Sequence, residues 1–134
     1  MKPVCLVIGA GAGIGGNVAK RFALEGYHAV LCRRSDGEGL ERMVAEIEAA
    51  GGSASGYLLN AVDDNTIEER VAAIEEELGP VEVAVYNLGA QVGNRTLADT
   101  SYKTFEMGWR LGTFGLFRLA QVLTPRMVER GKGA

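Results

Sequence analysis

The chain is poor in the residues that build disulfide frameworks and metal sites. Its 134 residues include two cysteines, one histidine and one tryptophan. One cysteine pair is a poor disulfide framework, and Cys5 and Cys32 lie in apolar runs, where a free cysteine behaves as a small buried hydrophobe. His28, at a helix-strand junction, belongs to no cluster with metal-ligand spacing. We therefore expect packing roles for the two cysteines and no metal.

Long apolar runs and strong charge of one sign are also absent. The apolar run at residues 4–8 is too short for the core of a signal peptide or for a bilayer span. With a formal net charge of −3 and no basic stripe interleaved with aromatics, the sequence argues against nucleic acid as a partner. We expect one cytoplasmic domain over residues 1–134, large enough to bury a core and without a membrane partner.

Glycine, by contrast, is abundant, with 19 residues. The apolar run at 4–8 leads straight into a turn that contains Gly11, Gly13 and Gly16. Glycines let a backbone approach a diphosphate closely, and the helix that follows directs its free amides and positive end at that charge. A G-x-G-x-x-G match alone is weak evidence, but the predicted strand before it and helix after it make the match more specific. We interpret the turn as a dinucleotide-phosphate cradle; the alternative is a tight turn that only closes helix onto strand.

Apolar periodicity predicts strands alternating with helices. Ile14, Val18 and Phe22 share one face of a first helix, and Ser35 three residues before Glu38 resembles a capping box for a second. Right-handed crossovers then predict a Rossmann-like, doubly wound parallel α/β sheet of order 3-2-1-4, truncated after about four strands, with ligands at the carboxyl ends near the first and fourth strands. The predicted strands are residues 4–8, 29–33, 54–59 and 81–86.

The last predicted helix runs from about Ser101 into the 120s and carries two apolar stripes. Two stripes are wider than a surface helix needs, so we expect burial on two sides. Gly108, Gly112 and Gly115 each cost about 1 kcal/mol relative to alanine in a helix, which points to close approach of another backbone. The alternative is a short, irregular helix.

Four segments together resemble the short-chain dehydrogenase/reductase family. Ile8-Gly9-Ala10-Gly11-Ala12-Gly13-Ile14-Gly15 matches the family's Thr-Gly-x-x-x-Gly-Ile-Gly except at the threonine. Asn60-Ala61 resembles the family's Asp-Val, and Tyr86-Asn87-Leu88-Gly89 resembles its Asn-Asn-Ala-Gly. A long helix carrying Gly112-Thr113-Phe114 and ending near Pro125 and Met127 completes a resemblance that covers the whole chain.

The resemblance implies a dinucleotide site at the carboxyl ends of the strands. Asn60 retains an amide oxygen that can accept the adenine amino proton, as the family's carboxylate does. The segment after the fourth strand would pass close to the nicotinamide ribose, or would be only a strand-terminating turn. The implied cofactor-binding residues are Gly9, Gly11, Ala12, Gly13, Ile14, Gly15, Arg33, Arg34, Asn60, Ala61, Asn87, Leu88 and Gly89.

The choice of cofactor depends on the residues that follow the second strand. Dehydrogenases that prefer NAD usually carry an acidic residue there, which binds the ribose hydroxyls and would repel a 2′-phosphate. This chain has Arg33 and Arg34 instead. A charge-assisted hydrogen bond from a guanidinium to phosphate contributes roughly 1.5–3 kcal/mol. We predict NADP(H) over NAD(H); the alternative is that both arginines are only solvated.

The catalytic Tyr-x-x-x-Lys pair and serine of the family have no counterpart here. The four tyrosines are followed four positions later by Leu31, Ala61, Ala90 and Glu106. Trp109 stands at the place of the family's proton-relay asparagine, and because an indole accepts no hydrogen bond, its apolar stripe favours a core role. We therefore expect no catalytic residue within these 134 residues.

Two functions follow as alternatives. The first is the cofactor-binding portion of a longer NADP-dependent oxidoreductase that acts on a small alcohol or carbonyl substrate. The second is a non-catalytic dinucleotide-binding sensor or regulatory module. A reading frame that continues past Ala134 into Ser and Tyr-x-x-x-Lys would favour the first. We also expect a homo-oligomer, because an unpaired edge strand at 81–86 and an uncovered apolar helix promote self-association.

Overall fold

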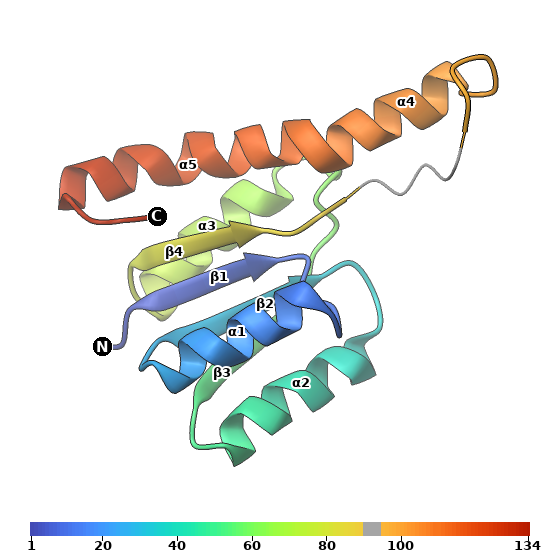
Figure 1. Cartoon of the computed structure of the whole chain (residues 1–134). Helices are drawn as coiled ribbons and strands as arrows, with labels where there is room; N and C mark the ends of the chain where they lie inside the picture. The colour runs from blue at the N-terminus through green and yellow to red at the C-terminus, as the bar shows by residue number, and fades with distance from the viewer. Residues whose placement is uncertain (90–94) are drawn as a thin grey trace.

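The computed structural model describes residues 1–89 and 95–134. Strands and helices alternate along the chain, and the last three helical segments run on without a break (Figure 1). The elements are β1 (Val4–Ile8), α1 (Ile14–Leu24), β2 (His28–Arg33), α2 (Gly37–Ala49), β3 (Ser53–Leu58), α3 (Thr66–Glu77), β4 (Val81–Tyr86), α4 (Tyr102–Trp109), the π-helical segment η1 (Arg110–Phe114) and α5 (Gly115–Arg130).

The four strands form one parallel sheet in the order β3-β2-β1-β4. The predicted doubly wound α/β fold and its strand order are therefore confirmed. β1 is central and pairs in parallel with β2 on one side and β4 on the other. The carboxyl ends of β1 and β4 are neighbours at the point where the chain reverses its direction of winding.

Side chains of β1 alternate between two cores. Val4, Leu6 and Ile8 face a core completed by α3 and α5, to which α5 contributes Leu119 and Leu123. Cys5 and Val7 face the opposite core, which α1 and α2 complete. Every residue of β1 is buried, as expected of a parallel strand covered on both faces.

The start of α2 differs from the prediction by one residue. Asp36 caps the helix in place of Ser35, because its left-handed backbone (φ 62°) brings Oδ1 within 3.0 Å of the Gly39 N–H. A short carboxylate tolerates this conformation and satisfies a free helix amide. The predicted Ser35–Glu38 capping box is therefore wrong.

The buried face of α1 is also different from the predicted one. Ile14 is 72% exposed, and Val18 and Phe22 are only half-buried. The buried positions are instead Gly15, Gly16, Ala19 and Ala23. These small residues let the helix axis approach the sheet closely, a role that counting large apolar residues does not detect.

The final helix is longer and more exposed than predicted. It continues to Arg130 through Pro125, and no residue of α4 is buried. On α5 the sheet-facing side is buried while Leu116 and Phe117 stay half-exposed, so burial on two sides is not observed. A Cβ at Gly112 would meet nothing within 4 Å, whereas one at Gly115 would collide with the Tyr86 hydroxyl. At Gly115, a side chain makes the close approach, not a backbone.

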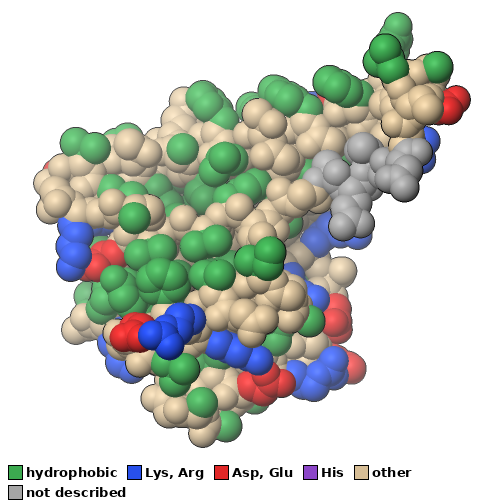
Figure 2. Space-filling view, viewed as in Figure 1, with side chains coloured by type: hydrophobic (Ala, Val, Ile, Leu, Met, Phe, Trp, Pro, Cys, Tyr) green, Lys and Arg blue, Asp and Glu red, His purple; other side chains and the backbone are tan. Residues whose placement is uncertain are grey.

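The outer edge of β4 is partly paired, contrary to the predicted open edge. The Ala84 N–H donates to the Ala134 carbonyl, and the Ala134 N–H donates to the Glu82 carbonyl, each at 2.9 Å. Hydrophobic side chains still gather over β4, between α1 and the long helix (Figure 2). Val83 and Val85, on the face that α1 and α2 cover elsewhere, are only partly buried.

We expect the two thiols to be unreactive in the folded chain. Burial raises the pKa of both Cys5 and Cys32 to about 12, and both are free cysteines in the interior. Since the thiolate is the nucleophile, a maleimide at neutral pH should label neither residue before unfolding and both after unfolding in guanidinium. Mass spectrometry of the native protein would contradict this packing role if it found either thiol labelled within minutes.

Candidate functional site

The glycine-rich turn links the carboxyl ends of β1, β2 and β4. The amides of Gly9 and Ala10 both donate to the Cys32 carbonyl of β2 at 2.9 Å. Gly9 has φ +92°, and a Cβ there would lie 2.4 Å from the Asn87 carbonyl oxygen at the end of β4. Only glycine fits at this position.

The same turn is pressed against the start of α1. A Cβ on Gly15 would lie 2.2 Å from the Gly9 carbonyl oxygen, and one on Gly16 would lie 2.3 Å from that of Gly11. Gly11 and Gly13, in contrast, face open space, with no atom within 4 Å of an added Cβ. One side of the turn is therefore closely packed, while the other lies open to a ligand.

The N-terminus of α1 opens onto that free side. Gly13 caps the helix without a side-chain hydrogen bond, and Ala12, Gly13 and Ile14 are exposed. A helix start without a side-chain cap presents amide groups and positive partial charge to a ligand anion. The open side of the turn thus offers space and positive partial charge to an anionic ligand.

A hollow of about 270 Å³ continues from the turn between α1 and α2. Gly11 and Ala12 border it, as does Arg33, whose Nη1 lies 3.5 Å from Asp36 Oδ2. Arg34 is exposed beside it and does not line it. The structure thus separates the two predicted arginines, with only Arg33 in the hollow.

Two further cations in the hollow were not predicted. Lys20 comes from α1 and is paired with Glu46 at 2.5 Å, and Arg42 comes from α2. Each sits on the helix face that meets the other helix, so their helical positions could have indicated a shared basic hollow once the βαβ order was known.

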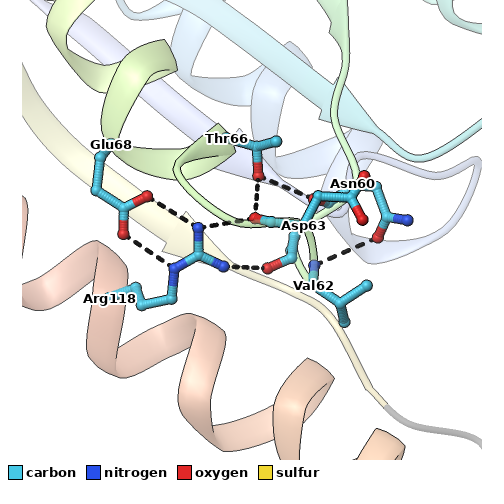
Figure 3. A network of polar contacts seen from close by, with 7 residues as sticks. Asn60, Val62, Asp63, Thr66, Glu68 and Arg118 are labelled. Carbon is cyan, nitrogen blue, oxygen red and sulfur yellow. Dashed lines mark hydrogen bonds and ion pairs between the residues drawn. The ribbon is translucent and has the colours of Figure 1, made fainter.

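Asn60 and Ala61 follow β3 in a short loop that runs to α3. Asn60 Oδ1 accepts a hydrogen bond from the Val62 N–H at 3.3 Å, and the Asn60 carbonyl accepts one from Thr66 Oγ1 at 2.9 Å (Figure 3). Ala61 is buried. The loop lies at the same edge of the sheet as the glycine turn (Figure 1).

Arg118 of α5 reaches into this loop and was missed by sequence reasoning. Its Nη1 donates to the Ala61 carbonyl at 2.6 Å and its Nη2 to the Asp63 carbonyl at 3.0 Å. Nε and Nη2 bind the two carboxylate oxygens of Glu68 at 2.9 and 2.8 Å (Figure 3). Arg118 is 8% exposed, the only buried charged side chain in the described part of the chain. The sequence signal that could have revealed this role was the position of Arg118 among apolar residues on one face of its helix.

Hydrogen bonding couples the ionisation of this pair. The hydrogen bonds that Arg118 donates to Glu68 hold the pKa of the Glu68 carboxyl below its usual range and raise the pKa of Arg118. Both groups are therefore ionised at neutral pH, and the ion pair is present under ordinary conditions.

The segment after β4 packs against the glycine turn. The Asn87 N–H donates to the Ile8 carbonyl at 2.8 Å, and Asn87 Nδ2 donates to the Gly9 carbonyl at 3.3 Å. Leu88 packs against the α3/α5 core, and Gly89 is exposed. The structure thus places Asn87 directly on the turn. The neighbouring Tyr86 hydroxyl donates to the Leu111 carbonyl in η1.

Trp109 lies away from the core. It is 47% exposed and stacks on Phe114, with ring centroids 5.1 Å apart. The π-helical segment η1 begins directly after Trp109, and neither α4 nor η1 contains a buried residue. The predicted core role of Trp109 is therefore wrong.

Residues 1–89 and 95–134 contain no group of three or more histidine, cysteine, aspartate or glutamate side chains arranged to hold a metal ion. Within the same ranges, no helix has the length and apolar character needed to cross a membrane.

Comparison with known proteins identifies the family. A family model described as short chain dehydrogenase matches residues 3–134. Fatty acyl-CoA reductase of Acinetobacter baylyi is 34% identical over 132 residues, which cover 97% of this chain and 44% of that protein.

Solved structures share the fold. A crystal structure of an actinorhodin polyketide ketoreductase variant with NADPH has a TM-score of 0.89 at 34% identity, covering 98% of this chain and 51% of that one. A metagenomic short-chain oxidoreductase in complex with NADP has a TM-score of 0.92 at 25% identity, covering 98% and 59%. The chain thus spans about half the length of these relatives. With the model match over nearly all its residues, it belongs to the short-chain dehydrogenase/reductase family.

Proposed function

We propose that this chain binds NADP(H) and forms the cofactor-binding part of an oxidoreductase that acts on a small alcohol or carbonyl compound. The observation that carries the proposal is the open glycine turn at the β1/β4 switch point, with Asn87 packed on it and a basic hollow beside it. The hydride chemistry would come from the bound nicotinamide, and the residues named here would bind and orient it.

The basic hollow supports NADP(H) over NAD(H). Arg33, Lys20 and Arg42 line it, and two acidic residues, Asp36 and Glu46, offset part of their charge. A 2′-phosphate could take the place of Asp36 as the partner of Arg33, because a guanidinium binds phosphate in a bidentate manner. The similar structures with NADPH and with NADP are consistent with this choice.

We expect the chain to bind NADPH more tightly than NADH. Arg33→Ala should weaken NADPH binding by roughly 10- to 100-fold and leave NADH binding nearly unchanged, because a lost charged hydrogen bond is worth roughly 1.5–3 kcal/mol. Fluorescence titration of both cofactors measures the two affinities. Arg21→Ala is the matched control, since Arg21 is an exposed cation of α1 paired with Glu25. Equal or tighter binding of NADH than of NADPH by the wild-type chain would contradict the proposed preference for NADP(H).

Two glycine substitutions distinguish the effect of the glycine turn on stability from its effect on cofactor binding. Gly15→Ala places a methyl against the Gly9 carbonyl and should lower the free energy of unfolding by about 1–3 kcal/mol. Gly11→Ala adds a methyl on the open side, so it should change stability by less than about 0.5 kcal/mol and still weaken NADPH binding. Urea unfolding and cofactor titration of both variants measure these effects. Wild-type NADPH affinity in Gly11→Ala would show that the diphosphate does not lie against this turn.

We further propose that the chain associates with itself through the long helix. Phe105 and Phe117 are 71% and 57% exposed, and Leu116 and Trp109 are nearly half-exposed. Apolar surface of this extent along one helix favours association, because burying it releases ordered water. The residues lie on α5, which runs alongside β4, and on α4, which continues the same helix beyond the end of the sheet (Figure 1).

Light scattering should therefore give a mass above that of one chain. Phe117→Glu should shift the protein toward the monomer, because a carboxylate at the contact would be desolvated without a partner. Leu24→Glu is the control, since Leu24 is 62% exposed but lies on α1. A monomeric wild-type chain at the highest concentration tested would contradict this proposal.

A further inference from the structure

We infer that Arg118 is a positioning residue that holds the 60–63 loop in the shape needed to recognise the cofactor's adenine. The inference rests on the proposed function, since it assigns a role within the same cofactor site. Arg118 belongs to α5, far from the loop in sequence, and it touches the loop only through main-chain carbonyls.

The loop's conformation depends on hydrogen bonds to its carbonyl groups. Arg118 binds the carbonyls of Ala61 and Asp63, and Thr66 Oγ1 binds those of Asn60 and Asp63 at 2.9 Å each (Figure 3). A trans peptide directs its C=O and N–H to opposite sides. Holding the Asn60 carbonyl toward Thr66 therefore directs the Ala61 N–H away from α3. Arg118 holds the Ala61 carbonyl, so the Val62 N–H on the other side of that peptide points away from Arg118 and donates to Asn60 Oδ1 at 3.3 Å. Arg118 and Thr66 together therefore fix the backbone that carries Asn60 and Ala61.

Charge pairing indicates that Arg118 does not itself bind phosphate. Both carboxylate oxygens of Glu68 are within 2.9 Å of its guanidinium, so its charge is already balanced. Two further N–H groups donate to the loop carbonyls, and the side chain is buried. Arg118 would act through the loop and would not contact the ligand.

A second arginine on α5 provides a matched control. Arg126 Nη1 binds Glu75 Oε2 at 2.9 Å, so it also joins α5 to α3 through an arginine–glutamate pair. Arg126 makes no contact with the 60–63 loop among the hydrogen bonds of the described residues. Arg126 is more exposed than Arg118, and Glu75 also binds Arg130 at 3.0 Å, so the comparison uses the ratio of two ligand affinities and not the loss of stability.

The test compares NADPH with its hypoxanthine analogue, in which an oxygen replaces the adenine amino group. In the wild-type chain, Asn60 Oδ1 can accept a hydrogen bond from the amino group, so NADPH should bind about 10-fold more tightly than the analogue, the effect of one hydrogen bond. In Arg118→Met we expect NADPH binding to weaken by about 10-fold and the preference to fall to about twofold or less. Arg126→Met should keep the wild-type preference.

The ratio of the two affinities separates positioning from stability. A general loss of stability weakens the binding of both ligands by the same factor, so it leaves the ratio of the two affinities unchanged. If Arg118→Met does not fold by circular dichroism, Arg118→Lys keeps a cation beside Glu68, and its single ammonium cannot span the carboxylate and both carbonyls. In that variant, the preference for NADPH over the analogue should fall from about 10-fold to about fivefold or less.

Each remaining outcome overturns a specific claim. A folded Arg118 variant with the wild-type ratio overturns the positioning role, and so does a wild-type chain that binds both ligands equally. A wild-type chain that binds neither NADPH nor NADH overturns the proposed function itself. This last result needs no variant, so failure of the function and failure of the inference can be told apart.

Discussion

The rest of the structure depends on direct backbone contact at the glycine turn. Gly9 lies against the Asn87 carbonyl, and Gly15 lies against the Gly9 carbonyl, at distances that no Cβ could tolerate. These contacts bring the end of β1, the start of α1 and the end of β4 to one point. Because the turn's inner side is used in this packing, only its outer side, at Gly11 and Gly13, is left for a ligand. The fold and the candidate site therefore both depend on glycines, which have no side chain, in this turn.

The sequence predicted the order of elements because their periodicities are strong and local. Continuous apolar character marked β1 and β4, and helical spacing marked the segments between them. Positions set by close packing were harder to predict. Ile14 suggested the buried face of α1, but Ala19 and Ala23 occupy it, because small residues allow a closer approach than large ones. Asp36 displaced Ser35 as a cap through a left-handed conformation that no pattern of residue types specified.

Within the site, local motifs were found and long-range pairs were missed. The glycine turn, Arg33 and the Asn60–Ala61 loop each lie at or just after the carboxyl end of a strand, so their common edge could be inferred from topology. The contact of Arg118 with Glu68 joins residues 50 positions apart, and its existence depends on how α5 crosses α3. Trp109 was misplaced for a related reason: its apolar spacing assumed one regular helix, whereas π-helical geometry begins at Arg110, and the Tyr86 hydroxyl donates to the Leu111 carbonyl within that segment.

The two faces of α5 join two parts of the molecule. On successive residues, Phe117 faces outward and Arg118 faces the 60–63 loop. A buried arginine paired with a carboxylate and two carbonyls has few alternative arrangements, because each donor that left its partner would leave a polar group unsatisfied. The position of α5 is therefore transmitted rigidly to the loop beside Asn60. A helix whose outer face is apolar and whose inner face holds the 60–63 loop makes the geometry of the candidate site dependent on the packing of that helix.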